Sequence, residues 1–170
     1  LSTAELSLMQ AKKEIAVYGE RTYRMFGMVK DLYYESNEDN FLKIYSRIEK
    51  YESISDRMEI EIANYLTFVS EGRLSSESKE EIRTMFRAVT EIQSIADSCN
   101  NLARAIRRRN EGKGEFTEML NHNMDQMFAI VDESIKQMNI VLHKAEVVHD
   151  DINVSYNIEN EINNYGNQLK

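Results

Sequence analysis

The sequence predicts an all-α protein built from long helices. The chain has 170 residues, with no proline and only six glycines, so the residues that usually interrupt helices are scarce. Apolar residues recur at alternating three- and four-residue intervals, which is the period of one helix face. Strands are usually only about 5–6 residues long, so uninterrupted segments of this kind favour helices over a sheet.

The first two predicted helices are separated by a polar stretch at residues 36–40, whose side-chain oxygens can cap the second helix. The first runs from about Thr3 to Tyr34. Its inward stripe is Leu8, Ala11, Ile15, Tyr18, Thr22, Met25, Val29 and Leu32, widened by Phe26. The second runs from about Phe41 to Ser70. Its stripe is Phe41, Ile44, Ile48, Tyr51, Ser55, Met58, Ile62, Tyr65 and Val69.

Three further helices are predicted after Gly72, which suits a helix end, and Ser75 or Ser76, which suits an N-cap. The third runs from about Ser78 to Asn110, and residues 110–114 form the clearest linker. Its inward residues are Ile82, Met85, Phe86, Val89, Ile92, Ala96, Cys99, Leu102, Ala103 and Ile106. The fourth helix runs from about Phe116 to Lys144, and the fifth from about Asp151 to the end.

A weak internal repeat predicts the domain organisation. Residues 25–29 (Met-Phe-Gly-Met-Val) resemble 127–131 (Met-Phe-Ala-Ile-Val), and residues 61–65 resemble 161–165. The two matches occur in the same order and at nearly the same offset, so they indicate a repeated three-helix unit. We expect residues 1–112 to form the first unit and 115–170 the first two helices of a second, whose third helix would follow Lys170.

Charge and composition exclude several classes of protein. The net charge is −8, whereas a nucleic-acid-binding domain is usually basic. The only cysteine, Cys99, has no partner for an internal disulfide, which favours a reducing compartment such as the cytoplasm. No apolar run approaches the roughly 20 residues that span a bilayer, and no signal peptide is visible. Because the chain starts at Leu1 and not at Met, we expect it to be part of a longer protein, whose membrane part would lie outside it.

Three carboxylates form the strongest candidate site. Glu52 and Asp56 stand four residues apart on the second helix and so share a face, and Asp97 flanks the apolar stripe of the third. If these helices are antiparallel, the three side chains converge, as carboxylates do in metal sites within helical bundles. Gln93 and Asn101 would join that face as neutral ligands. The alternative interpretation is a solvated acidic margin, which is common on helices.

Four arginines, Arg104, Arg107, Arg108 and Arg109, end the third helix. They either complement the helix dipole or contact an anionic headgroup or an acidic partner. We find no phosphate-binding glycine loop, paired-cysteine zinc motif or nucleophile elbow, so no enzyme activity is predicted. A carboxylate-bridged di-metal enzyme usually needs two Glu-x-x-His pairs, and only Glu146 with His149 is present.

Two segments resemble the signatures of PhoU-type domains. Residues 52–56 (Glu-Ser-Ile-Ser-Asp), followed by Glu61-Ile62, resemble the acidic motif of that family's second helix. Residues 91–97, followed by Asn101-Leu102-Ala103, resemble its partner motif on the third. The resemblance implies tandem three-helix bundles and a metal site for a divalent, iron or zinc ion at Glu52, Asp56 and Asp97. Gln93 stands where the family has a carboxylate, which weakens that site.

The architecture is most similar to the PhoU-like domain of bacterial sodium/phosphate cotransporters. This resemblance implies a regulatory domain on the cytoplasmic face of the inner membrane, which modulates phosphate uptake through contacts with the transporter domain of its own chain or with a second copy. The alternative is a free-standing phosphate-signalling adaptor. At the repeat offset, Glu52 and Asp56 correspond to Ile152 and Tyr156, so the second unit has no equivalent ligand pair.

Overall fold

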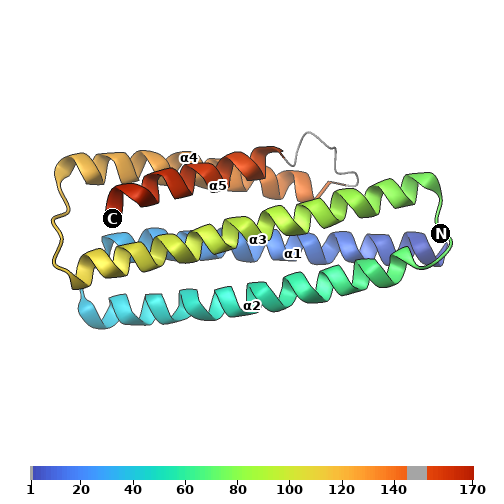
Figure 1. Ribbon diagram of the computed structural model, residues 1–170, viewed down its shortest axis with the longest axis horizontal. Coiled ribbons are helices and arrows are strands. Elements are labelled where there is room, and N and C mark those ends of the chain that lie inside the picture. The colour runs from blue at the N-terminus through green and yellow to red at the C-terminus, as the bar shows by residue number, and fades with distance from the viewer. Residues whose placement is uncertain (1, 145–152) are drawn as a thin grey trace.

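A computed structural model describes residues 2–144 and 153–170, and within these ranges it consists of helices and contains no strand (Figure 1). The predicted all-α fold class is confirmed. The elements are α1 (Thr3–Tyr34), α2 (Glu38–Ser70), α3 (Ser76–Glu111), α4 (Glu118–Leu142), α5 (Asn153–Gly166) and a short 3-10 helix, η2 (Asn167–Leu169).

Side-chain caps explain where the helices begin. The side chain of Asn37 accepts a hydrogen bond from the backbone N–H of Asn40, so α2 starts three residues earlier than its apolar pattern predicts. Ser75 caps α3 in the same way. Thr117 caps α4, which therefore begins two residues after the predicted Phe116. The predicted start of the fifth helix, Asp151, lies outside the described residues.

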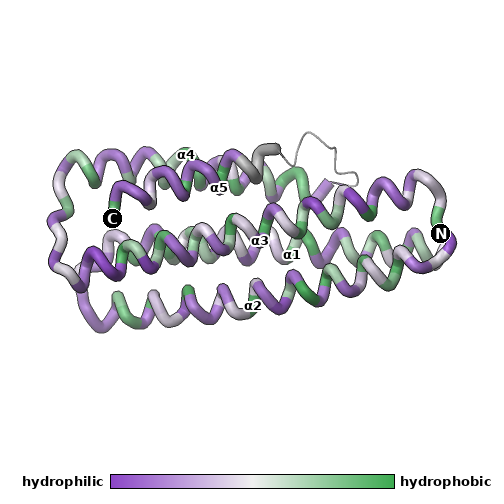
Figure 2. The backbone as a smooth tube through the Cα atoms, in the orientation of Figure 1, coloured by the Kyte–Doolittle hydropathy of each residue, from purple (hydrophilic) through white to green (hydrophobic). Residues whose placement is uncertain are grey.

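The helices lie nearly parallel or antiparallel to one another and form three layers (Figure 1). α1 and α3 occupy the middle. α2 packs on one side of them, whereas α4 contacts α1 and α5 contacts both α3 and α4 on the other side. Figure 2 shows hydrophobic and hydrophilic stretches alternating along each helix, as this layering requires. None of the helices in the described part is both long and apolar enough to cross a membrane.

The buried residues follow the predicted stripes closely on the two central helices. All eight stripe residues of α1 are buried, and so is Phe26. On α2, Ile44, Tyr51, Met58 and Tyr65 are only half-buried, because this outer helix has neighbours on one side alone. Two buried residues of α2, Tyr45 and Leu66, were not part of the predicted stripe.

Residues related by the internal repeat meet at the contact between α1 and α4. The Phe26 and Phe128 rings, which occupy equivalent repeat positions, pack edge to face with centroids 5.9 Å apart. The helices approach closely nearby, since a Cβ added to Gly19 would come within 2.6 Å of the Leu142 Cδ1 atom. The apolar core is continuous across both predicted units. The division at residues 113–114 stays a prediction.

Candidate metal centre

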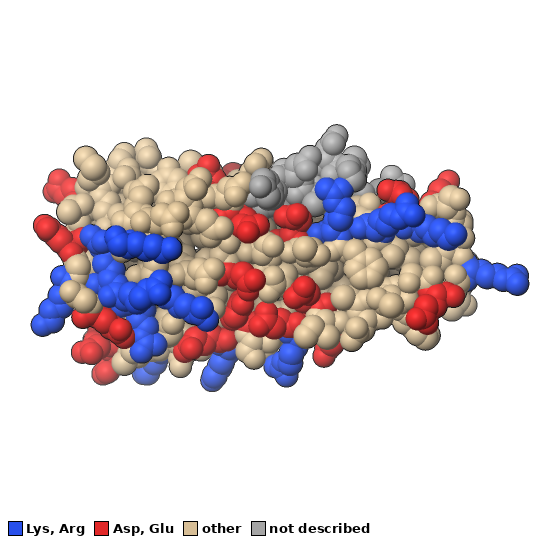
Figure 3. Space-filling view, in the orientation of Figure 1, with Lys and Arg blue, Asp and Glu red and all other residues tan. Residues whose placement is uncertain are grey.

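The structure brings together the three predicted carboxylates at the junction of α2 and α3. Glu52 and Asp56 lie one turn apart on α2, and Asp97 reaches them from α3, which runs antiparallel to α2. One carboxylate oxygen from each residue lies within 4.8 Å of the other two. In Figure 3, acidic side chains gather midway along the visible face, and lysine and arginine side chains gather at the end where α3 finishes.

Gln93 bridges two of these carboxylates. Its Nε2 atom donates to Asp97 Oδ1 at 3.0 Å and to Asp56 Oδ1 at 3.2 Å. The amide hydrogens thus offset part of the repulsion between two anions on different helices. Asn101, the other predicted neutral ligand, is exposed and lines a separate cavity between α3 and α5. Its role as a metal ligand stays a prediction.

Glu52 is the innermost of the three carboxylates. It is half-buried, and its Oε2 atom is fully buried without a hydrogen-bond donor. Burial raises the pKa of Glu52 to about 8, with further contributions from Asp97 and Asp56, while Arg104 acts in the opposite direction. Glu52 and Asp97 can share a hydrogen bond only when one of them is protonated. The raised pKa of Glu52 therefore agrees with its buried Oε2 atom, which has no donor to stabilise the ionised form.

Two residues near the cluster were not predicted as part of it. Glu59, on the same side of α2, has a raised pKa because of partial burial and the charges of Asp56 and Asp97. The buried hydroxyl of Tyr18, on α1, has no hydrogen-bond partner, and its pKa is raised by burial and then by the surrounding carboxylates. The spacing of Glu59 from Asp56 and Glu52, three and seven residues, is a signal for a shared helix face.

This arrangement suits a hard divalent cation. All of the charged donors are oxygen atoms from carboxylates, which Mg²⁺, Ca²⁺ and Mn²⁺ prefer, whereas zinc sites usually contain nitrogen or sulfur. A cation would give the Glu52 Oε2 atom a partner and would offset the burial and the neighbouring carboxylates that raise its pKa. The residues present therefore fit a metal ion, although the metal role of Glu52, Asp56 and Asp97 stays a prediction.

Comparison with known proteins gives one match. The family model described as "PhoU domain" matches residues 15–106, a range that holds most of α1, all of α2 and most of α3. All three carboxylates and Gln93 fall within it. The search of curated proteins and the search of solved structures each gave no match.

Proposed function

The chain belongs to the PhoU domain family, and from this premise we propose that it is a phosphate-regulatory module that holds a divalent cation at Glu52, Asp56 and Asp97. The family match covers more than half of the chain. Members of this family are regulatory and not catalytic, and they act through protein contacts. The convergence of three carboxylates from two helices is the observation that supports the cation site.

The proposed cation would join α2 to α3. α2 is an outer helix that packs on α1 and α3, so ligands from both sides of the α2–α3 contact would fix its position. Glu52 and Asp56 would hold the ion from α2 and Asp97 from α3. Gln93 donates to both aspartates in its present orientation, and rotation of its amide would present Oε1 to the ion. When bound, the metal would supply positive charge and would link α2 to α3.

Cation and proton would compete for Glu52. Its pKa is raised to about 8, so in the metal-free protein this carboxyl is largely protonated at neutral pH. Binding of a cation would displace that proton, so affinity should rise with pH until Glu52 is ionised. Occupancy of the site by the cation would therefore depend on both the cation concentration and the pH.

The domain organisation and the wider protein remain proposals. We propose that residues 1–112 and 115–170 are two units related by the internal repeat, which the Phe26–Phe128 contact supports. Self-association and a position beside the transporter domain of a sodium/phosphate cotransporter also stay predictions. The family match supports phosphate regulation in general and favours the adaptor interpretation over the cotransporter domain.

Elemental mass spectrometry tests the cation site directly. The protein is purified without chelator or affinity-column metal, dialysed against Mg²⁺ or Mn²⁺ and compared with a Glu52→Ala/Asp56→Ala/Asp97→Ala variant. We expect one equivalent of metal in the wild type and none in this variant. The matched control removes three exposed acids, Glu49→Ala and Glu61→Ala on α2 and Glu71→Ala just after it, and should keep its metal. Absence of metal from the wild type, or its retention in the first variant, would overturn the proposal.

A further inference from the structure

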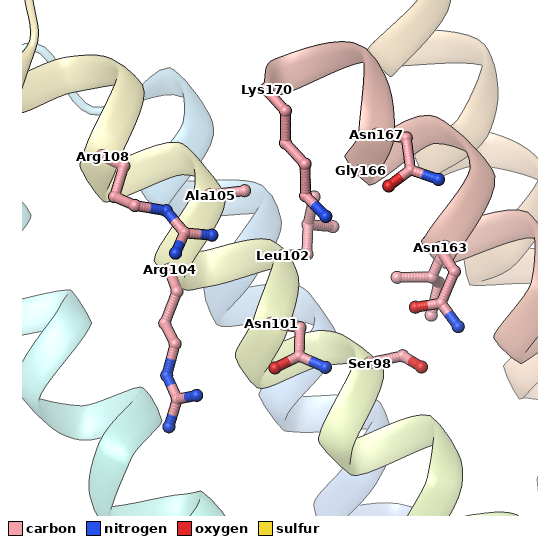
Figure 4. Close-up of a pocket in the computed structure, with 11 residues that line it drawn as sticks. Ser98, Asn101, Leu102, Arg104, Ala105, Arg108, Asn163, Gly166, Asn167 and Lys170 are labelled. Atoms are coloured by element: carbon pink, nitrogen blue, oxygen red, sulfur yellow. The ribbon is translucent and has the colours of Figure 1, made fainter.

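A second, positively charged recess lies between α3 and α5, near the end of the molecule where both helices finish (Figure 4). It has a volume of about 460 Å³. Three cationic side chains line it, and they come from two regions far apart in the sequence: Arg104 and Arg108 on α3, and Lys170 after η2. The amides of Asn101 and Asn163 add neutral hydrogen-bond donors from opposite walls.

The charges of these three cations are not used in ion pairs within the described part of the chain. Two neighbouring arginines differ from them. Arg107 is paired with Glu111 at 2.7 Å and lies over the Tyr45 ring, and Arg109 donates to backbone carbonyls. By contrast, no described carboxylate lies within ion-pair distance of Arg104, Arg108 or Lys170. An anion entering the recess would therefore meet Arg108 and Lys170 without a competing carboxylate, whereas the charge of Arg104 also acts on Glu52.

The position of Lys170 is fixed by its neighbours. Leu169 is buried against the core, and Arg109 Nη1 donates to the Leu169 carbonyl at 3.4 Å. Figure 4 shows the Lys170 side chain extending across the recess toward α3, while the Arg108 guanidinium turns toward the same space. An adjoining hollow of about 510 Å³ is lined by Arg108 and Lys170 from the other side. Both cationic groups are therefore accessible.

Helix dipoles do not account for this cluster. Cations in the last turn of a helix complement its dipole, which explains Arg108. However, Arg104 lies seven residues before the end of α3, and Lys170 belongs to a different segment. α3 and α5 also direct their C-terminal ends, which carry partial negative charge, toward this part of the molecule. Attraction for an anion must therefore come from the side chains.

We propose that the recess between α3 and α5 binds a phosphate-bearing anion through Arg108 and Lys170, with Arg104 at its rim and Asn101 and Asn163 as neutral donors. Arginine offers two N–H groups in the geometry of a phosphate, and lysine adds a point charge. The recess falls within the 300–1,000 Å³ range of small-molecule pockets and is larger than a single phosphate needs, so pyrophosphate or the phosphate chain of a nucleotide would occupy it better. This site is separate from the cation site and does not depend on it.

Isothermal titration with orthophosphate, pyrophosphate and ATP, each compared with sulfate, tests this site. We expect saturable binding of pyrophosphate or ATP, weakened about tenfold or more in an Arg108→Gln/Lys170→Gln variant, because two charge-assisted hydrogen-bond donors are lost. The matched control, Arg73→Gln/Arg83→Gln, removes two exposed cations at the other end of the molecule and should bind within about twofold of the wild type. Equal weakening in both variants would show nonspecific charge attraction and overturn the proposal.

A near-isosteric variant tests the recess a second time, and vesicle sedimentation tests whether the ligand is a lipid headgroup. Asn163→Asp places a carboxylate on the wall at an exposed position, so it should abolish anion binding without unfolding the protein, as circular dichroism would verify. Full binding by this variant would overturn the site. Sedimentation with phosphatidylglycerol vesicles distinguishes lipid headgroups from free anions. Binding to vesicles with no saturable binding of any free phosphate compound would also overturn the proposal.

Discussion

The acidic cluster and the cationic recess lie on the same face of one helix but have opposite charge. Gln93 and Asp97 face the cluster, and Asn101, Arg104 and Arg108 line the recess, at spacings of three or four residues along α3; the Arg104 guanidinium extends toward α2 (Figure 4). The partner helix determines the difference, because α2 adds carboxylates at the first position whereas α5 and the residues after it add amides and an ammonium group at the second. A single long helix can thus supply half of two chemically unlike sites.

The largest expected effect comes from replacing the negative charge of Asp97 by a positive one. Asp97→Lys would remove a proposed ligand and place an ammonium group beside Glu52 and Asp56, so we expect Mn²⁺ affinity to fall by about 100-fold or more. Pyrophosphate affinity should rise at the same time. Isothermal titration measures both, and Asp97→Asn serves as the control with a smaller loss. Unchanged Mn²⁺ affinity in the lysine variant would show that Asp97 is not a ligand.

A gain of about tenfold is expected from Gln93→Glu. This substitution replaces the bridging amide by a fourth carboxylate at the position where the Gln93 side chain already reaches Asp56 and Asp97. It should strengthen cation binding and lower the stability of the metal-free protein, since two hydrogen bonds become repulsive contacts. Mn²⁺ titration and urea denaturation in chelator check the two parts. Increased stability without metal would contradict the geometry described for Gln93.

The third prediction concerns pH. Glu52 ionises near its ordinary value of 4.5 in the unfolded chain and at about 8 in the folded protein, so the folded state holds the proton over that interval. The stability of metal-free protein should therefore fall as pH rises from about 5 to 8, by about 1–2 kcal/mol after allowance for solvent screening of a half-exposed group. Glu52→Gln should flatten this dependence in urea denaturation with chelator. The same slope in both proteins would refute it.

The smallest expected effect is coupling between the sites, and it depends on both proposals. Asp97 and Arg104 are seven residues apart, or about 10 Å along the helix, which is close to the screening length at physiological salt. Arg104 also lowers the pKa of Glu52, so the two sites interact through this residue. Bound Mn²⁺ should strengthen pyrophosphate binding about two- to threefold, and reciprocally. Arg104→Ala or 0.5 M salt, roughly, should remove the coupling.

Local sequence patterns predicted the elements and the acidic cluster but not the recess. Helix stripes depend on residues three or four apart, and Glu52, Asp56 and Asp97 lie on helices joined by a short loop. The recess depends on Lys170 and Asn163 meeting Arg108 across the α3–α5 contact, about sixty residues along the chain, and no periodicity carries that information. Tyr45 and Leu66 were missed because the buried face of α2 is shifted by one residue there, so that Tyr45 and Leu66 are buried in place of the predicted Ile44 and Tyr65.

The two chain ends lie at opposite ends of the long molecule, and this has a practical consequence for experiments (Figure 1). A fusion partner or affinity tag attached after Lys170 would emerge at the mouth of the cationic recess, where a polyhistidine segment would alter both its access and its charge. An N-terminal tag would leave from the far end, beyond the start of α1. Surface immobilisation and fluorophore attachment should therefore also use the N-terminus.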